Sequence, residues 1–476
     1  MSTPRHATLP SGTQPSPTGH SGRAFRLVDA SAARPRRRAA TALLLWAVLL
    51  GNVGVIVWLW MHGGNLVHLD RSGDLLTSFG RLTGLLGAYS ALIQVLLLAR
   101  LPFLERIVGL DRLSVWHRWN GHVCLDLVLA HVVLTVWGYA LLDRISLPKE
   151  ISTMLGGGVY PGMITATVGT ALLIAVVVSS VVIIKRRLRY EAWYLVHLTA
   201  YAGIALAWFH QIPTGNELVL DRIAADYWRS LYIATFVLLV GYRLGVPIVN
   251  ALRFRLRVAE VVEEGPGVVS LRITGRGVER LKPRAGQFFL WRFLTRGRWS
   301  TSHPFSLSAA PDGRSLRITV RALGDHTARL GQIPVGARVL AEGPFGVFTD
   351  AVRRRDKVAL IAGGIGITPI RALLEEMRGD VVVLYRVVSH ADVIFGDELS
   401  SLARERGAAL HIVDGDHATT AGRRLLSPEH LRRLVPDLAE RDVFVCGPPA
   451  MTTAIERNVR RAGVPARHIH TERFAL

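Results

Sequence analysis

The sequence predicts a multidomain membrane protein, in which a six-helix transmembrane bundle precedes an antiparallel β-barrel domain and an α/β domain with a parallel sheet. Half of the 476 residues are apolar and the mean hydropathy is +0.30, although 20% of the residues are charged. This mixture is typical of membrane spans joined to soluble domains. Six apolar runs, each near the roughly 20 residues that cross a bilayer, come first. Short alternating strands follow, and then strands that alternate with helices.

The composition changes along the chain and divides it into four expected segments. Residues 1–38 are rich in Pro, Ser, Gly and Arg without an apolar period, which predicts a disordered tail. Residues 39–250 hold the transmembrane domain, with apolar runs at 39–61, 75–99, 115–141, 162–184, 191–210 and 229–249. Residues 251–352 alternate apolar and polar side chains, as half-buried barrel strands do. Residues 353–476 alternate buried strands with helices, which indicates a parallel sheet.

The net charge of +21 comes from 57 Lys and Arg against 36 Asp and Glu. Such an excess can indicate nucleic-acid binding. Here, however, many of the basic residues lie before the first apolar run and in every second loop, at 34–38, 100–112, 185–189 and 243–257. The positive-inside rule makes these loops cytoplasmic. We therefore expect a multi-pass protein of the plasma membrane that contacts lipid, has both termini and both soluble domains in the cytoplasm, and binds no nucleic acid.

Four of the 17 histidines lie inside predicted spans, His117 and His131 in the third and His197 and His210 in the fifth. Ionisable side chains in spans are costly and usually functional. A spacing of fourteen residues is about 40° short of whole turns, so His117 and His131 share a helix face. Two imidazoles on each of two helices can hold two stacked haems. The alternative is that they form polar contacts between helices.

Three other features bear on this haem hypothesis. Thirteen residues separate His197 from His210, which leaves them about 140° apart on an ideal helix, so a tightened turn or a tilt must bring them into line. His122 lies on the side of its helix opposite His131 and is not an expected ligand. The chain has two cysteines, Cys124 and Cys446, which excludes a disulfide framework and a cysteine-based zinc site.

Residues 80–122 (GRLTGLLGAYSALIQVLLLARLPFLERIVGLDRLSVWHRWNGH) and 189–211 (RYEAWYLVHLTAYAGIALAWFHQ) resemble the ferric reductase-like transmembrane domain of NADPH oxidases and membrane ferric reductases. The resemblance implies two b-type haems, the inner one on His117 and His197 and the outer one on His131 and His210. Arg81 matches a family arginine near the outer haem and the oxygen site, although an arginine here can also snorkel to the membrane surface. NADPH oxidases carry a histidine where this chain has Thr135, which favours a ferric acceptor over oxygen.

HPFSLSAAP (303–311), which follows AGQFFLWRF and precedes EGPFG (342–346), resembles the flavin-binding segment of the ferredoxin–NADP reductase superfamily. The resemblance implies that FAD is bound by His303, Pro304, Phe305, Ser306, Arg321, Gly324, Thr327 and Gly343. The Ser306 hydroxyl is expected near the reactive flavin nitrogen. Phe474 resembles the carboxyl-terminal aromatic residue that stacks on the flavin in such reductases.

AGGIGITPI (362–370) joins a buried strand to a helix, and its glycines let the backbone approach a pyrophosphate at the helix amino terminus. With CGPPAM (446–451) it resembles the dinucleotide motif of the same superfamily. The implied NAD(P)H-binding residues are Gly364, Gly366, Thr368, Pro369, Cys446, Gly447 and Pro448, and Cys446 is expected near the hydride path. Arg386 and Ser389 end the next strand without a carboxylate beside them in the sequence, so NADPH is favoured, with NADH possible.

These features predict a transmembrane flavohaem oxidoreductase that moves electrons from cytoplasmic NAD(P)H through FAD and two b-type haems to an extracytoplasmic acceptor. FAD is required because nicotinamide gives two electrons and haem accepts one. Ferric iron is the expected acceptor, and reduction of oxygen to superoxide or H2O2 is the first alternative. The others are a haem-free membrane anchor for a reductase module and a non-enzymatic haem-binding membrane protein.

Overall fold

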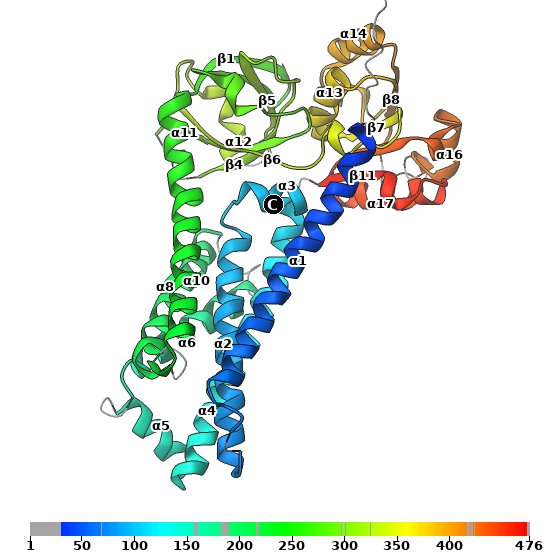
Figure 1. Cartoon of the computed structure of the whole chain (residues 1–476). Coiled ribbons are helices and arrows are strands. Elements are labelled where there is room, and N and C mark those ends of the chain that lie inside the picture. Colours follow the sequence, from blue (N-terminus) through cyan, green and yellow to red (C-terminus); the bar gives the residue numbers. More distant parts are fainter. Residues whose placement is uncertain are drawn as a thin grey trace, which may run out of the picture.

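The computed structural model describes residues 30–67, 69–156, 160–181, 190–215, 219–296, 298–299, 301–323, 325–416, 419, 422 and 424–473. Six helices in this part of the chain are long and apolar enough to span a membrane: Thr41–His62, Ser72–Leu97, Arg112–Asp143, Met163–Ser180, Ala192–Gln211 and Arg222–Phe254. They form an elongated bundle, and the strand-containing domains lie together at one end of it (Figure 1). We call this the domain-facing end of the bundle and the other its distal end. The predicted fold class is confirmed.

The spans belong to α1 (Ala30–His62), α2 (Ser72–Leu97), α4 (Leu110–Asp143), α6 (Met163–Ser180), α8 (Tyr190–Thr214) and α10 (Arg222–Val240). Short helices α3 (Pro102–Val108) and α5 (Leu147–Leu155) flank α4. The side chain of Asp221 caps α10 by accepting hydrogen bonds from the backbone N–H groups of Ile223 and Ala224, at 2.8 and 3.2 Å. A π-helical turn, Gly241–Gly245, then continues α10 into α11 (Val246–Phe254).

Glycines let the helices of the bundle approach closely in two pairs, α2 with α4 and α6 with α8. A Cβ atom on Gly80 of α2 would lie 2.7 Å from Oγ1 of Thr135, and one on Gly84 would lie 2.7 Å from Nδ1 of His131. A Cβ atom on Gly169 of α6 would lie 2.7 Å from the carbonyl oxygen of Gly203 in α8. Small residues at such contacts strengthen helix association in a bilayer, where apolar burial adds no driving force.

The first soluble domain consists of two three-stranded antiparallel sheets. One sheet has the order β1 (Arg257–Gly265), β2 (Val268–Thr274), β5 (Ser315–Arg321), and the other has β4 (His303–Ser306), β3 (Phe288–Phe293), β6 (Val339–Phe345). Their inner faces share an apolar core that includes the fully buried Phe289 and Trp291. The expected barrel is not closed in the described residues, where only isolated bridges, such as Leu307 with Ile318, join the sheets. All four residues of β4 pair with β3.

The second domain is a five-stranded parallel sheet in the order β11 (Ile469–Arg473), β10 (Asp442–Gly447), β7 (Lys357–Gly363), β8 (Asp380–Val387), β9 (Ala409–Asp414). It packs with helices α13 (Ile367–Glu376), α14 (Gly396–Arg406), α16 (Pro428–Leu434) and α17 (Pro449–Arg461). The strand order reverses between β7 and β10. In open α/β sheets, ligands bind at this reversal, beyond the carboxyl ends of the strands.

Three kinds of contact fix the soluble domains to the bundle and to each other. Phe254 at the end of α11 belongs to the core of the first domain, and its carbonyl oxygen accepts the N–H of Arg276 at 2.7 Å. Arg100, after α2, forms an ion pair with Glu342 on β6, and burial lowers the pKa of Arg100 to about 10, so it stays charged. Between the two soluble domains, Arg317 and Glu398 form an ion pair at 3.1 Å.

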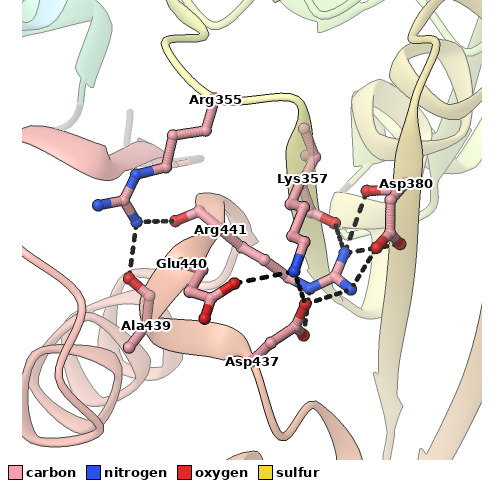
Figure 2. Close-up of polar contacts among 8 residues, drawn as sticks. Arg355, Lys357, Asp380, Asp437, Ala439, Glu440 and Arg441 are labelled. Atoms are coloured by element: carbon pink, nitrogen blue, oxygen red, sulfur yellow. Dashed lines mark hydrogen bonds and ion pairs between the residues drawn. The ribbon is translucent and has the colours of Figure 1, made fainter.

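A network of charged side chains holds the amino ends of β7, β8 and β10, at the edge opposite the carboxyl ends (Figure 2). The guanidinium of Arg441, which is 5% exposed, donates to Asp380 at 2.9 Å and to Asp437 at 2.7 and 3.0 Å. Lys357 contacts Asp437 at 2.9 Å and Glu440 at 2.8 Å. The position of this network indicates a structural role.

We expect the substitution Arg441→Met to destabilise the α/β domain by about 2 kcal/mol, because it removes charge-assisted hydrogen bonds to two partly exposed carboxylates. Hydrogen–deuterium exchange of β8 and β10 in the full chain measures this loss as reduced protection. Lys357→Met is the matched control, since its side chain is 42% exposed and should matter less. Equal loss of protection in the two variants would contradict the assignment of Arg441 as the centre of the network.

Candidate functional site

The four histidines inside the bundle form two facing pairs. The ring centres of His117 and His197 are 6.0 Å apart, and those of His131 and His210 are 6.4 Å apart. Two imidazoles bound on opposite sides of one metal ion, with metal–nitrogen bonds of about 2.0 Å, have ring centres about 6 Å apart. Each pair therefore fits one metal ion between its rings. We call them the domain-facing pair (His117, His197) and the distal pair (His131, His210).

Hydrogen bonds orient three of these imidazoles. Nδ1 of His117 lies 3.1 Å from the carbonyl oxygen of Gln94, and Nδ1 of His131 lies 2.7 Å from that of Gly80. A carbonyl oxygen only accepts, so both Nδ1 atoms carry the proton and both Nε2 atoms keep a lone pair. Nδ1 of His197 lies 3.3 Å from Oγ of Ser180, whose own proton goes to the Val176 carbonyl. This tautomer is the one found in metal-ligating histidines.

Helix α8 is continuous around the second histidine pair. It runs from Tyr190 to Thr214 without a 3-10 segment, so a tightened turn does not account for the thirteen-residue spacing. The rings of His131 and His210 nevertheless face each other across the two helices. No group of three or more His, Cys, Asp and Glu in the described residues is arranged to hold a metal ion.

Other predicted residues of the bundle lie around these pairs. Arg81 donates from Nη1 to Oδ1 of Asn65 at 3.0 Å, which ties it to the loop after α1. Oγ1 of Thr135 is 3.4 Å from Nδ1 of His131 and therefore lies on the edge of that ring away from Nε2. His122 is exposed, and Cys124 is buried with Sγ 3.7 Å from the Gly87 carbonyl. These positions agree with a packing role for Cys124.

The predicted flavin segment forms β4 and its neighbour β3. The rings of His303 and Phe305 are stacked, with centres 6.1 Å apart and planes 15° apart, and Pro304 pairs with Leu290 of β3. Ser306 is 4% exposed and its Oγ has no hydrogen-bond partner. Buried hydroxyls are nearly always paired. The orphaned Ser306 hydroxyl fits a site that receives a polar ligand atom, as the resemblance to flavin domains implies.

The residues expected around the FAD phosphates have partners within the protein. Arg321 forms an ion pair with Asp392 of the α/β domain at 3.2 Å, and Oγ1 of Thr327 accepts the N–H of Leu323 at 2.9 Å. A Cβ atom on Gly343 would lie 2.7 Å from the ring of Phe289. Gly324 lies outside the described residues. A phosphate bound here must therefore share Arg321 with Asp392.

The predicted pyrophosphate loop lies at the carboxyl end of β7, where the strand order reverses. Gly364 has a φ angle of +52°, and a Cβ atom there would meet no atom within 4 Å, so its backbone is open to a ligand. A Cβ atom on Gly366 would lie 2.4 Å from the Cys446 carbonyl, so only glycine allows this contact with β10. Thr368 and Pro369 are buried in the first turn of α13, where Oγ1 of Thr368 donates to the Ile365 carbonyl at 3.1 Å.

The segment after β10 lies beside this loop. Cys446 is fully buried, and burial raises the pKa of its thiol well above the usual range, so the thiol is neutral. A Cβ atom on Gly447 would lie 2.7 Å from the Met451 side chain, and Pro448 precedes α17. The Cys446 side chain therefore packs in the core in this structure. Phe474, the expected stacking residue, lies outside the described residues.

The predicted adenosine site is more acidic than the strand sequence indicates. Arg386 donates to the carbonyls of Val387 and Gly422, both at 3.3 Å. Burial lowers the pKa of Arg386, and the nearby carboxylates of Asp414 and Asp416 oppose that shift. Asp414 is the last residue of β9, which pairs with β8, and Asp416 follows two residues later. Ser389 accepts the N–H of Ala391 at 3.4 Å, so its hydroxyl caps a turn.

Comparison with known proteins agrees with this geometry. Residues 83–208 match the family model of the ferric reductase like transmembrane component, and residues 360–457 match the oxidoreductase NAD-binding domain. The 3-ketosteroid-9-alpha-monooxygenase, ferredoxin reductase component of Mycolicibacterium smegmatis is 35% identical over 233 residues, which are 46% of this chain and 65% of that protein. NADH oxidoreductase HCR of Escherichia coli is 28% identical over 224 residues, 45% of this chain and 66% of that protein.

The chain thus spans just under two thirds of the length of these relatives. Among solved structures, the flavohem-like FAD/NAD binding domain of nitric oxide dioxygenase from Vibrio cholerae has 22% identity and a TM-score of 0.38, and the match covers 47% of this chain and 99% of that one. The two family matches lie on the helical bundle and on the parallel sheet. This chain therefore carries, in one polypeptide, one segment that matches the ferric reductase like transmembrane component and another that matches the oxidoreductase NAD-binding domain.

Proposed function

We propose that this protein moves electrons from NAD(P)H, through FAD and two b-type haems, to ferric iron on the other side of the membrane. The observation that carries the proposal is the presence of two facing histidine pairs, one after the other along α4 and α8. The same chain has a dinucleotide-binding fold at one end of the bundle. FAD would accept a two-electron hydride and pass single electrons to haem.

The residues of the bundle support this proposal by their tautomers and spacing. The carbonyls of Gln94 and Gly80 hold protons on Nδ1 of His117 and His131, which leaves Nε2 free to bind iron. Fourteen residues place the two imidazoles of α4 about 21 Å apart along the helix axis. One pair thus lies near each end of the span, as electron transfer across a membrane requires.

The direction of transfer follows from the charges at the two ends of the bundle. Arg100, Arg112, Arg243 and Arg253 lie at the domain-facing end, which the positive-inside rule assigns to the cytoplasm. The basic residues Lys185, Arg186, Arg187 and Arg189 lie outside the described residues. We infer a plasma membrane protein with NAD(P)H bound in the cytoplasm and the acceptor outside.

Ferric iron is the proposed acceptor because this chain lacks the histidine that NADPH oxidases carry on α4, one helical turn after His131. Thr135 stands there, and its hydroxyl lies by Nδ1 of His131. Reduction of oxygen to superoxide is the second candidate.

We propose that residues 39–250 carry out transmembrane electron transfer, that residues 251–352 bind FAD and that residues 353–476 bind NAD(P)H. A tail of residues 1–38 precedes these domains.

Haem content tests the proposal directly. Pyridine haemochrome analysis of the purified, haem-supplied protein should give two b-type haems per chain, and NAD(P)H should reduce both under anaerobic conditions. His131→Ala should lower the ratio to one, because it removes one ligand of the distal pair, whereas the exposed His122→Ala should leave it at two. A ratio near zero in the wild type, or a loss with His122→Ala alone, would contradict the ligand assignment.

The contact between α2 and α4 gives a second test. Gly84→Ala would place a methyl group 2.7 Å from Nδ1 of His131, so the imidazole must move and the distal haem should be lost or weakened. Gly51→Ala is the matched control, because a Cβ atom there would meet nothing within 4 Å. Haem-to-protein ratios of about one and two, respectively, are expected, and a full haem complement in Gly84→Ala would argue against the close contact.

Arg386 tests the choice of nicotinamide cofactor. A guanidinium binds a 2′-phosphate with charge-assisted hydrogen bonds, so Arg386→Ala should lower kcat/KM at least tenfold for NADPH. It should leave kcat/KM for NADH nearly unchanged, or raise it. Steady-state kinetics with both cofactors measures the difference. Equal losses would mean that Arg386 acts only through its hydrogen bonds to Val387 and Gly422.

A further inference from the structure

A buried carboxylate lies at the distal end of the bundle without a partner. Glu150, in the short helix α5 between α4 and α6, is 0% exposed, and neither of its carboxylate oxygens has a hydrogen-bond partner. Burying an ionised carboxylate without a partner is costly. The transmembrane electron path proposed above does not use Glu150, so its burial needs another explanation.

Acidic and phenolic groups gather around this carboxylate. Burial and then the neighbouring Asp143, the last residue of α4, raise the pKa of Glu150. Burial and then the charges of Tyr139, Glu150 and Asp143 raise the pKa of Tyr160. The rings of Tyr139 and Tyr160 are 5.7 Å apart. These groups therefore lie close enough to interact electrostatically.

The basic side chains beside this cluster do not neutralise it. Arg144 and Lys149 are adjacent in sequence to Asp143 and Glu150, yet neither reaches the carboxylate of Glu150, whose oxygens have no partner among the described residues. Both basic residues are exposed. Among the described residues, no cation therefore pairs with the Glu150 carboxylate.

The cluster lies next to the distal histidine pair. Two residues after Tyr160, a Cβ atom on Gly162 would lie 2.8 Å from Cα of His210. Tyr139 follows His131 by eight residues on α4, which is about 12 Å along the axis. The segment that carries Tyr160 therefore runs from the cluster directly to the histidine pair nearest the distal surface.

We propose that Asp143, Glu150 and Tyr160 form a docking site for a multivalent hard cation, and that the ferric acceptor binds there as a cationic species. Carboxylate and phenol oxygens suit hard cations. The identity of the cation rests on the proposed function. Each ferric ion would take one electron and leave as a ferrous ion, so one NAD(P)H reduces two ferric ions and releases NAD(P)+ and one proton.

The small number of ligands suits an acceptor that must leave. Two carboxylates and one phenol attract a trivalent ion, and the attraction falls when reduction removes one of its three charges. A site with more carboxylates would retain the product. The same charges should repel anionic acceptors, which gives the site a measurable preference.

Binding of Tb3+ to the purified full-length protein tests the site without electron transfer, because nearby tyrosines sensitise the luminescence of this hard trivalent ion. We expect saturable emission, and at least tenfold weaker binding in Glu150→Gln and in Asp143→Asn. Asp143 is exposed, so its variant should fold even if Glu150→Gln does not. Asp226→Asn is the matched control, since Asp226 also lies at the distal end and is already paired with Arg229 at 3.3 Å. Unchanged affinity in both cluster variants, or an equal loss in Asp226→Asn, would overturn the proposal.

Kinetics separates this proposal from the proposed function. Glu150→Gln should lower kcat/KM for the cationic acceptor hexaammineruthenium(III) at least fivefold and should not lower it for the anion ferricyanide. Equal effects on both acceptors would overturn the docking site, while haem reduction by NAD(P)H would still support the electron path. In a third outcome, Tb3+ binding depends on Asp143 and Glu150, but NAD(P)H does not reduce the haems. This outcome would support the docking site and contradict the proposed function.

Discussion

The close approach of α2 to α4 is the contact on which the rest of the site depends. Glycines at positions 80 and 84 of α2 remove the side chains that would otherwise separate the helices. The carbonyl of Gly80 can then reach Nδ1 of His131, and one end of the same helix brings the Gln94 carbonyl to Nδ1 of His117. The protons held there leave both Nε2 atoms with a lone pair, and the rings of His197 and His210 on α8 complete the two pairs. A helix interface thus determines both the position of the histidines and their chemical form.

The soluble domains take their position from the same bundle. The last span continues through α11 into the core of the first domain, and the Arg100–Glu342 ion pair joins that domain to the end of α2. The pairing of Arg317 with Glu398 then links the sheet that follows. Because α2 also holds the histidines of α4, the dinucleotide-binding fold and the domain-facing pair are fixed relative to one helix. This arrangement suits the transfer of electrons between them without large movements of the chain.

Much of this architecture could be predicted from the sequence because its signals are local. Apolar runs gave the six spans, strand–helix alternation gave the parallel sheet, and the histidine spacing on α4 gave one shared face. Contacts between distant segments could not be predicted in this way. The Gly80 carbonyl that orients His131, the carboxylates of Asp414 and Asp416 beside Arg386, and the burial of Glu150 all depend on how helices and strands meet. The absence of a continuous ladder between the two antiparallel sheets of the described residues is likewise a matter of how distant strands meet.

Transfer of electrons across the bilayer is the central claim, and sidedness tests it most directly. Proteoliposomes in which the soluble domains face outward would carry a ferric chelate inside, and NAD(P)H would be added only outside. If electrons cross the bundle, the trapped ferric ion is reduced at a rate that depends on His117 and His131. The opposite result is that the trapped chelate stays oxidised and ferric chelate is reduced only in the compartment that holds NAD(P)H. That result would contradict electron transfer across the bilayer and would leave the bundle as a membrane anchor.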